Sequence, residues 1–169
     1  MTVPVAHGAE PASSRPHVSS NGRYSVRAIS PDPKTCQLEI TQETEVVWES
    51  PRCFGTLDDL YFISNDGVRV WVLRALPNMA KVKNPRLLGS VAGRAIGAIL
   101  VGKPGNVVAS RTVNSFMKTV RARGKIEGLS THFRWLQGAV GKGGKPPRSN
   151  DNNQVEFETL DGRTHRLRF

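Results

Sequence analysis

The turn Asn65-Asp66-Gly67 and the two apolar runs that flank it constrain the fold of this chain more than any other stretch. The runs, "DLYFIS" before the turn and "VRVWVLRAL" after it, are rich in aromatic and β-branched residues. An Asn/Asp-Gly step between such runs is a strong local signal for a β-hairpin. Similar runs recur along the chain, so the sequence predicts a mainly β fold built from antiparallel hairpins.

The C-terminal stretch "QVEFETLDGRTHRLRF" predicts its own strand register. A loop of residues 160–162, with its glycine in the left-handed bulge position, pairs Phe157 with His165. Glu156 then faces Arg166 on the opposite side, so one face is apolar and the other carries paired charges. A two-residue Asp-Gly loop sets Phe157 against Arg166 instead. The alternation of apolar and charged residues and the turn chemistry therefore both favour the three-residue loop.

A further hairpin is predicted in "AIGAILVGKPGNVVASRTV", where Pro104 and Gly105 separate two apolar runs. Proline fixes its own φ and glycine accepts a positive φ, which suits the two central positions of a type II turn. We therefore expect a type II turn with Pro104 first and Gly105 second.

Cys36 and Cys53, the only two cysteines, lie around another predicted hairpin, "TCQLEITQETEVVWES". If Ile40 pairs with Glu45, Cys36 faces Glu49, and Cys53 comes four residues later in a position to fold back. A disulfide between the two cysteines is expected only in an oxidising compartment. In the cytoplasm both would be half-buried thiols.

Two short helices are predicted between the hairpins. The first, in "VNSFMKTVRARGK", places four apolar side chains on one helical face: Val113, Phe116, Met117 and Val120. The second, in "LSTHFRWLQG", begins at Ser130 and ends at Gly138, with Phe133 and Leu136 pointing inward.

The domain organisation follows from composition. The first residues are small, polar and rich in proline, which predicts a disordered arm over 1–19 and a single β-rich domain over 20–169. We expect antiparallel hairpins in a partial sandwich or a propeller-like sheet, with one or two short α-helices.

A short motif occurs twice, at Ser20–Val26 and at Ser64–Val72. Each copy contains Ser, Asn and Gly followed by an apolar strand, and Gly22 and Gly67 are 45 residues apart. That spacing is about the length of one β-propeller blade. The motif resembles the S-x-D-G-x-x-V turn and strand of bacterial β-propeller repeats, and the resemblance implies propeller-like packing. Two similar turns in an ordinary β-rich domain are the alternative.

Positive charge is concentrated in the middle of the chain. The net charge is +10, and residues 68–148 contain 16 Lys and Arg but one acid, Glu127. Such asymmetry favours an anionic partner, either nucleic acid or an acidic protein. The alternative is a basic surface that only keeps the protein in solution.

Eight basic residues of segment 118–148 are the candidates for polyanion binding: Lys118, Arg121, Arg123, Lys125, Arg134, Lys142, Lys145 and Arg148. Trp135 lies off the predicted apolar helix face, so it is the candidate for stacking on a base.

Three motifs that suggest more specific chemistry are incomplete. "VGKGGK", residues 140–145, resembles the GxxG loop of KH RNA-binding domains, but the prolines after it exclude the helix that must follow. "GAILVGKP", residues 97–104, has proline where a phosphate-binding loop needs Ser or Thr. Asp58 and Asp59 could hold a cation or act as acid and base, although adjacent carboxylates at a strand start are more typical of capping.

The sequence therefore predicts no catalytic site, no metal site and no cofactor. We expect a non-catalytic binding or structural module, with polyanion binding as the second hypothesis and an unrecognised enzyme as the third. A homodimer through an unpaired sheet edge is also considered.

Localisation is predicted from segments that the sequence lacks. No run approaches the roughly 20 apolar residues of a membrane helix, and no signal peptide is visible. We therefore expect a soluble cytoplasmic protein. A periplasmic or secreted protein is the alternative, if the true start lies upstream and the two cysteines pair.

Overall fold

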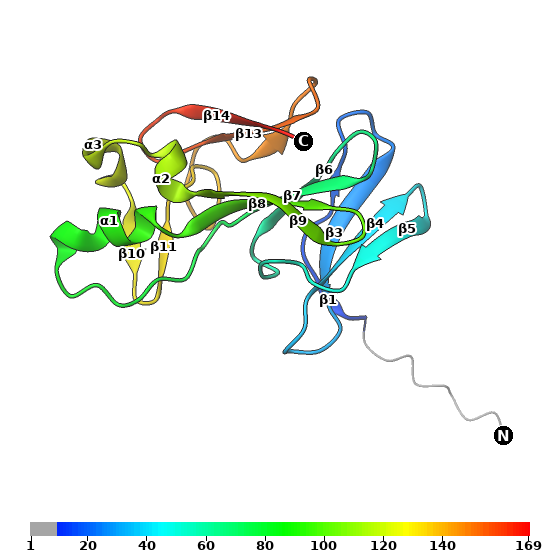
Figure 1. Cartoon of the computed structure of the whole chain (residues 1–169), viewed down its shortest axis with the longest axis horizontal. Coiled ribbons are helices and arrows are strands. Elements are labelled where there is room, and N and C mark those ends of the chain that lie inside the picture. The colour runs from blue at the N-terminus through cyan, green and yellow to red at the C-terminus, as the bar shows by residue number, and fades with distance from the viewer. Residues whose placement is uncertain (1–9) are drawn as a thin grey trace.

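The computed structural model describes residues 10–169, and antiparallel strands dominate it (Figure 1). The first sheet contains β1 (Ala12–Ser13), β2 (His17–Val18), β3 (Tyr24–Ser30), β4 (Gln37–Gln42) and β5 (Glu45–Ser50). The second, which we call the central sheet, contains β6 (Leu60–Ile63), β7 (Arg69–Leu73), β8 (Ile96–Gly102) and β9 (Asn106–Thr112). The prediction of a mainly β fold is confirmed.

Smaller elements complete the described part of the chain. Two further sheets are formed by β10 (Glu127–Leu129) with β11 (His132–Arg134), and by β12 (Arg148–Ser149), β13 (Gln154–Glu158) and β14 (Thr164–Arg168). A 3₁₀ turn, η1 (Pro85–Leu87), leads into the first of three short helices, α1 (Leu88–Gly93), α2 (Val113–Phe116) and α3 (Val120–Arg123).

Strands β6, β7 and β8 of the central sheet are buried on both faces. Successive side chains of a strand point to opposite faces, so Tyr61 packs with the first sheet while Phe62 packs with the C-terminal hairpin and the helices. On the next strand, Val72 packs with the first sheet and Trp71 with the C-terminal hairpin and the helices. A strand that is covered on both sides has no polar face, which explains why "VWVL" and "AILV" are continuous apolar runs.

Two of the predicted hairpins have the expected pairing. β6 and β7 pair around the Asn65-Asp66-Gly67 turn. In β13–β14, Phe157 faces His165 and Glu156 faces Arg166, with Gly162 at φ 86° in the predicted left-handed position. Turn chemistry and alternation were sufficient here because both strands and their loop are contiguous in sequence.

The turn between β8 and β9 differs from the prediction. The Lys103–Pro104 peptide bond is cis, and the Gly105 N–H donates to the Gly102 carbonyl at 2.7 Å. Pro104 is therefore the third residue of a type VI turn and not the second residue of a type II turn.

The register predicted for β4–β5 is also wrong. Gln42, not Ile40, faces Glu45, and a bulge lets Ile40 face Trp48. The turn is a tight one in which Glu43 adopts a φ of 56°, a conformation that a non-glycine residue rarely adopts. The prediction used a longer loop that leaves Glu43 unstrained.

Neither predicted helix forms as expected. Residues 113–123 make two separate helical turns, α2 and α3, because the backbone leaves helical geometry at Met117, which is fully buried. Val120, expected on the apolar face, is 80% exposed. Residues 130–137 contain strand β11 instead of a helix, and Phe133 and Trp135 are both buried with the spacing of a strand.

The folded region begins before residue 20. Strands β1 and β2, which the sequence placed in a disordered arm, both pair with β3. The buried Ser14 hydroxyl accepts a hydrogen bond from the Ala28 N–H, 2.8 Å away. Residues 1–9 of the predicted arm lie outside the described residues.

The two copies of the repeated motif form equivalent turns. The Ser19 hydroxyl donates to the Asn21 side chain at 2.7 Å, and the Ser64 hydroxyl donates to the Asp66 side chain at 2.6 Å. In each turn the glycine N–H then donates to the serine carbonyl, at 2.9 Å in both. The similarity of the two sequences is thus a similarity of hydrogen bonding, while the resemblance to propeller repeats stays a prediction.

The two turns also contact each other. The Asn65 side-chain oxygen accepts hydrogen bonds from the Ser20 hydroxyl and from the Asn21 N–H, both at 2.9 Å. This contact joins the first sheet to the central sheet at one end of both.

The glycines of these turns provide a matched pair of variants. Gly22 and Gly67 have φ values of 76° and 74°, but a Cβ at Gly22 meets open space and one at Gly67 lies 2.5 Å from the Tyr24 ring. We expect Gly22→Ala to lower the free energy of unfolding by about 1 kcal/mol through backbone strain alone. Gly67→Ala should lose roughly 1–3 kcal/mol more from the steric clash. Urea denaturation of both variants measures the difference, and equal losses would contradict the packing of Tyr24 on this turn.

Candidate anion-binding surface

Ion pairs neutralise two of the predicted basic residues. Arg148 contacts Glu156 at 2.6 Å and Glu158 at 2.9 Å, and Lys142 contacts Glu127 at 2.8 Å. The hydrogen bond from Arg148 holds the pKa of Glu158 below its ordinary value. These two cations therefore support the local structure and are poor candidates for binding a partner.

Arg123 also has a structural role. Its guanidinium donates to the Met117 carbonyl at 3.0 Å, and its side chain crosses α1 where Gly93 leaves room for it. Arg134 is half-buried in β11. Neither side chain is free to extend toward a partner.

The prediction that Trp135 stacks on a base is wrong. Its side chain is fully buried and its indole N–H donates to the Arg74 carbonyl at 2.7 Å. The ring lies in an aromatic cluster with Phe116 and Phe157, each with its centroid 5.7 Å away. The error follows from the helix prediction, because a strand turns the side chains of residues 133 and 135 to the same side.

The loop of residues 138–148 contains no helix, in agreement with its interpretation as a loop and not a KH-type clamp. Lys145 is exposed on it. The glycines at 138, 141 and 144 all have positive φ values, so this loop is shaped by conformations that only glycine adopts readily.

Three predicted cations remain exposed and close to α3: Lys118, Arg121 and Lys125. Arg121 and Lys125 line a shallow hollow of about 280 Å³ together with Arg163, which the sequence did not suggest. The only acid lining this hollow is Asp161, whose carboxylate already accepts a hydrogen bond from the Thr159 hydroxyl. The hollow is therefore electropositive.

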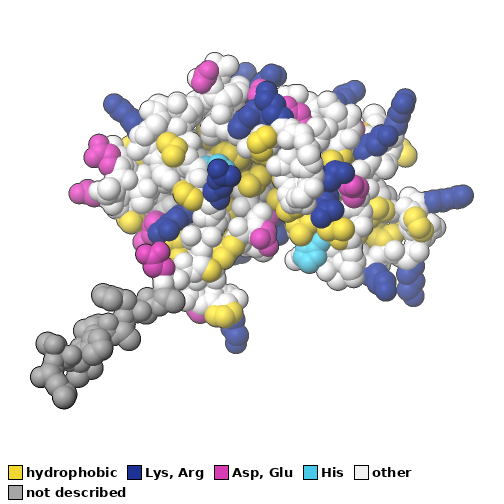
Figure 2. All heavy atoms as spheres, turned by 180° about the vertical axis from the view of Figure 1, so that it is seen from behind, with side chains coloured by type: hydrophobic (Ala, Val, Ile, Leu, Met, Phe, Trp, Pro, Cys, Tyr) yellow, Lys and Arg dark blue, Asp and Glu magenta, His cyan; other side chains and the backbone are white. Residues whose placement is uncertain are grey.

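Further cations lie on the neighbouring segment. Four exposed cations lie on the loop and 3₁₀ turn before α1 or directly after this helix: Lys81, Lys83, Arg86 and Arg94. No Asp or Glu occurs from residue 67 to residue 126. Figure 2 shows Lys and Arg side chains projecting from the end of the molecule that carries α1 and α3, while most acidic side chains on that face lie toward the other end. We call this end the basic end. Its exposed cations are Lys81, Lys83, Arg86, Arg94, Lys118, Arg121 and Lys125.

In the acidic pair Asp58-Asp59, Asp59 has a structural role. Asp59 is 3% exposed and accepts hydrogen bonds from the Thr56 N–H at 2.8 Å, the Ala75 N–H at 2.9 Å and Arg74 Nε at 2.8 Å. Asp58 is exposed. Burial raises the pKa of Tyr61, and the nearby Asp59 charge raises it further. Asp59 thus fixes the loop before β6, as the capping interpretation predicted.

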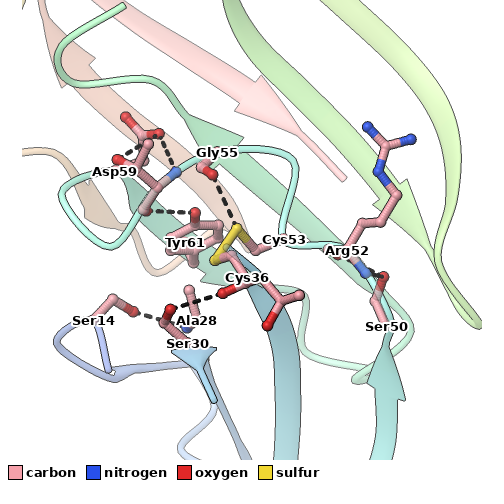
Figure 3. Close-up of a disulfide and its surroundings, with 12 residues drawn as sticks. Ser14, Ala28, Ser30, Cys36, Ser50, Arg52, Cys53, Gly55, Asp59 and Tyr61 are labelled. Atoms are coloured by element: carbon pink, nitrogen blue, oxygen red, sulfur yellow. Dashed lines mark hydrogen bonds between the residues drawn. A yellow bond between two sulfur atoms is a disulfide. The ribbon is translucent and has the colours of Figure 1, made fainter. Parts of the chain in front are cut away.

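The two cysteines form a disulfide, which lies beside Tyr61 (Figure 3). The Cys53 N–H donates to the Cys36 carbonyl at 2.9 Å. In the observed register Leu38 faces Ser50, the last residue of β5. The cysteines therefore meet just beyond the paired ends of β4 and β5, one before β4 and the other three residues after β5.

Residues 10–169 contain no helix that is both long and apolar enough to cross a membrane. Over the same residues, no cluster of three or more His, Cys, Asp and Glu side chains is placed to hold a metal ion. No protein-family model, curated protein or solved structure matches the chain. The basic end, with its unpaired exposed cations, is the strongest candidate site.

The structural role of Asp59 can be separated from that of its neighbour. We expect Asp59→Asn to lower the free energy of unfolding by about 2–4 kcal/mol, because it leaves buried donors and the Arg74 charge without a carboxylate. Asp58→Asn, a matched change at an exposed position, should stay within about 0.5 kcal/mol of the parent. Urea denaturation compares the two, and similar values for both variants would contradict the buried ion pair.

Proposed function

We propose that this protein is a non-catalytic binding module that holds an anionic macromolecule at its basic end. The observation that carries the proposal is the stretch from residue 67 to residue 126, which has no acid and exposes seven cations at this end of the molecule: Lys81, Lys83, Arg86, Arg94, Lys118, Arg121 and Lys125. Like charges that gather on one surface repel one another, and an anionic partner relieves that repulsion.

Charge neutralisation elsewhere supports this assignment. In the C-terminal hairpin, Glu156 pairs with both Arg148 and Arg166. In the first sheet, Arg27 pairs with Glu39 at 2.9 Å. In the described part of the chain, none of the seven exposed cations of the basic end takes part in an ion pair. The basic end thus lacks the carboxylate partners that Arg27, Arg148 and Arg166 have.

An acidic protein suits this surface better than single-stranded nucleic acid. Proteins that bind single strands combine cations with exposed aromatic rings on which bases stack. The aromatic residues nearest the basic end, Phe133 and Trp135, are fully buried, and Phe116 packs against the same core. Cations without a stacking platform favour a partner that is recognised by charge, such as a run of carboxylates.

The disulfide and the sheet edges extend the proposal. A Cys36–Cys53 bridge supports an oxidising compartment, the alternative to the cytoplasm.

Strands β5 and β9 lie at the edges of their sheets and expose Val46, Val107 and Val108. We place the homodimer contact at these two edges.

The test compares two charge variants of the full chain. The first combines Lys118→Gln, Arg121→Gln and Lys125→Gln at the basic end. The matched control combines Arg23→Gln, Arg69→Gln and Lys103→Gln, which are exposed on turns and strand ends away from α3. Fluorescence anisotropy measures binding to labelled polyglutamate and to labelled single- and double-stranded oligonucleotides across a salt series.

We expect the parent protein to bind polyglutamate at low salt, with an affinity that falls as salt rises. The basic-end variant should bind more weakly, and its affinity should depend less on salt. For duplex DNA, the slope of the logarithm of the binding constant against the logarithm of the salt concentration should become shallower by about 2–3. The control should keep the affinity and slope of the parent. Equal losses in both variants, or no binding of any probe at low salt, would contradict a localised anion-binding surface.

A further inference from the structure

The basic end contains an apolar groove. It consists of two adjoining hollows, of about 260 and 250 Å³, that share Pro85 and Leu88. Its apolar lining comes from α1 and the loop before it, from α3, and from β10 and the residue before it: Met79, Val82, Leu88, Val120, Ile126 and Leu129.

A glycine lines the first hollow. Gly128 lies in β10, and a Cβ at this position would lie 3.1 Å from one Leu88 methyl carbon and 3.6 Å from the Met79 methyl carbon. Because strand residues of any type adopt this backbone, flexibility does not explain the glycine here. Its effect is that the Leu88 side chain packs directly on the strand backbone, closer than it could approach a residue with a Cβ.

Apolar side chains along the groove are left in water. Val120 is 80% exposed on α3, and Leu87 is 53% exposed beside Leu88. Single exposed apolar residues are common, but a hollow lined by several of them and bordered by exposed ones is typical of a surface that binds a partner.

Cations surround this apolar floor. Lys81 and Arg86 line the two hollows and are exposed, and Arg123 lines one of them with its guanidinium held by the Met117 carbonyl. Lys83, Arg121 and Lys125 are exposed, and each lies next to a lining residue of the groove in the sequence. The one nearby acid of the segment, Glu127, is paired with Lys142 at 2.8 Å. A partner must therefore offer apolar groups to the floor and negative charge to the rim.

We propose that the groove binds an acidic amphipathic segment of another protein. Apolar side chains of the segment fill the groove, and its Asp and Glu side chains lie against the surrounding Lys and Arg. This inference rests on the proposed function and adds the class of partner. A concave apolar floor suits inserted side chains, whereas nucleic acid offers no aliphatic side chains and a lipid surface needs a protruding apolar face.

The probe is a labelled model peptide with leucine at the i, i+3, i+4 and i+7 positions and glutamate elsewhere, the spacing of a helix that lies in a groove. A second peptide has serine in place of every leucine and the same charge. We expect the leucine peptide to bind the full-length protein at least about tenfold more tightly, as measured by anisotropy at fixed ionic strength.

Gly128→Leu fills the groove without a change in charge and should bring the affinity for the leucine peptide down to that for the serine peptide. Gly143→Leu is the matched control, because a Cβ at that loop position meets open space. If Gly128→Leu does not fold, Val120→Ser serves instead, since that side chain is mostly exposed. It should weaken binding of the leucine peptide a few-fold and leave binding of the serine peptide unchanged.

Each outcome separates the two proposals. Equal affinity for the two peptides, with both still salt-dependent, would overturn the groove and leave charge-based binding intact. Tighter binding of a single-stranded oligonucleotide than of either peptide would overturn the partner class. If no peptide and no oligonucleotide binds at low salt, both the groove and the proposed function are wrong.

Discussion

Burial of both faces of β6, β7 and β8 in the central sheet is the constraint on which the rest of this structure depends. Strands β6, β7 and β8 carry apolar side chains on each side, so neither face is stable in water. The first sheet must cover one face, and the C-terminal hairpin with the α1–α3 region must cover the other. The three tryptophans reinforce this arrangement, because each indole N–H donates to a backbone carbonyl far along the chain: Trp48 to Gly67, Trp71 to Arg168 and Trp135 to Arg74.

The same constraint determines what is left at the surface. The aromatic residues of the basic segment are drawn into the core beneath the central sheet, and its Lys and Arg side chains remain outside. α1, α3 and β10 are short and lie at the margin of that core, so they do not close against one another completely. The groove at Leu88 and Gly128 is the space that remains between them.

The sequence predicted those features whose determinants are contiguous. The Leu160-Asp161-Gly162 loop and the alternation around it gave the whole β13–β14 register, and the Asn65-Asp66-Gly67 turn gave β6–β7. The β10–β11 hairpin was missed because "THFRW" fits a helical period as well as a strand period, and only its packing beneath α2 and β13 decides between them. That one error also placed Trp135 on the surface.

The candidate site was predictable only in part. Composition located the positive charge, but the partners of Arg148 and Lys142 could not be read from spacing alone. Arg163 joins Arg121 and Lys125 only because the C-terminal hairpin folds back toward α3. The groove had no signal in the sequence, since a single glycine such as Gly128 acquires meaning only from the two side chains that face it.

Native-state hydrogen exchange followed by NMR is the most direct test of the doubly covered central sheet. If the covering layers and the sheet depend on one another, amides of β3, β7, β8 and β13 should exchange through a common global opening, with free energies within about 1 kcal/mol of one another. Exchange of β3–β4 or of β13–β14 through a separate opening of much lower free energy, while β7 and β8 stay protected, would contradict that account.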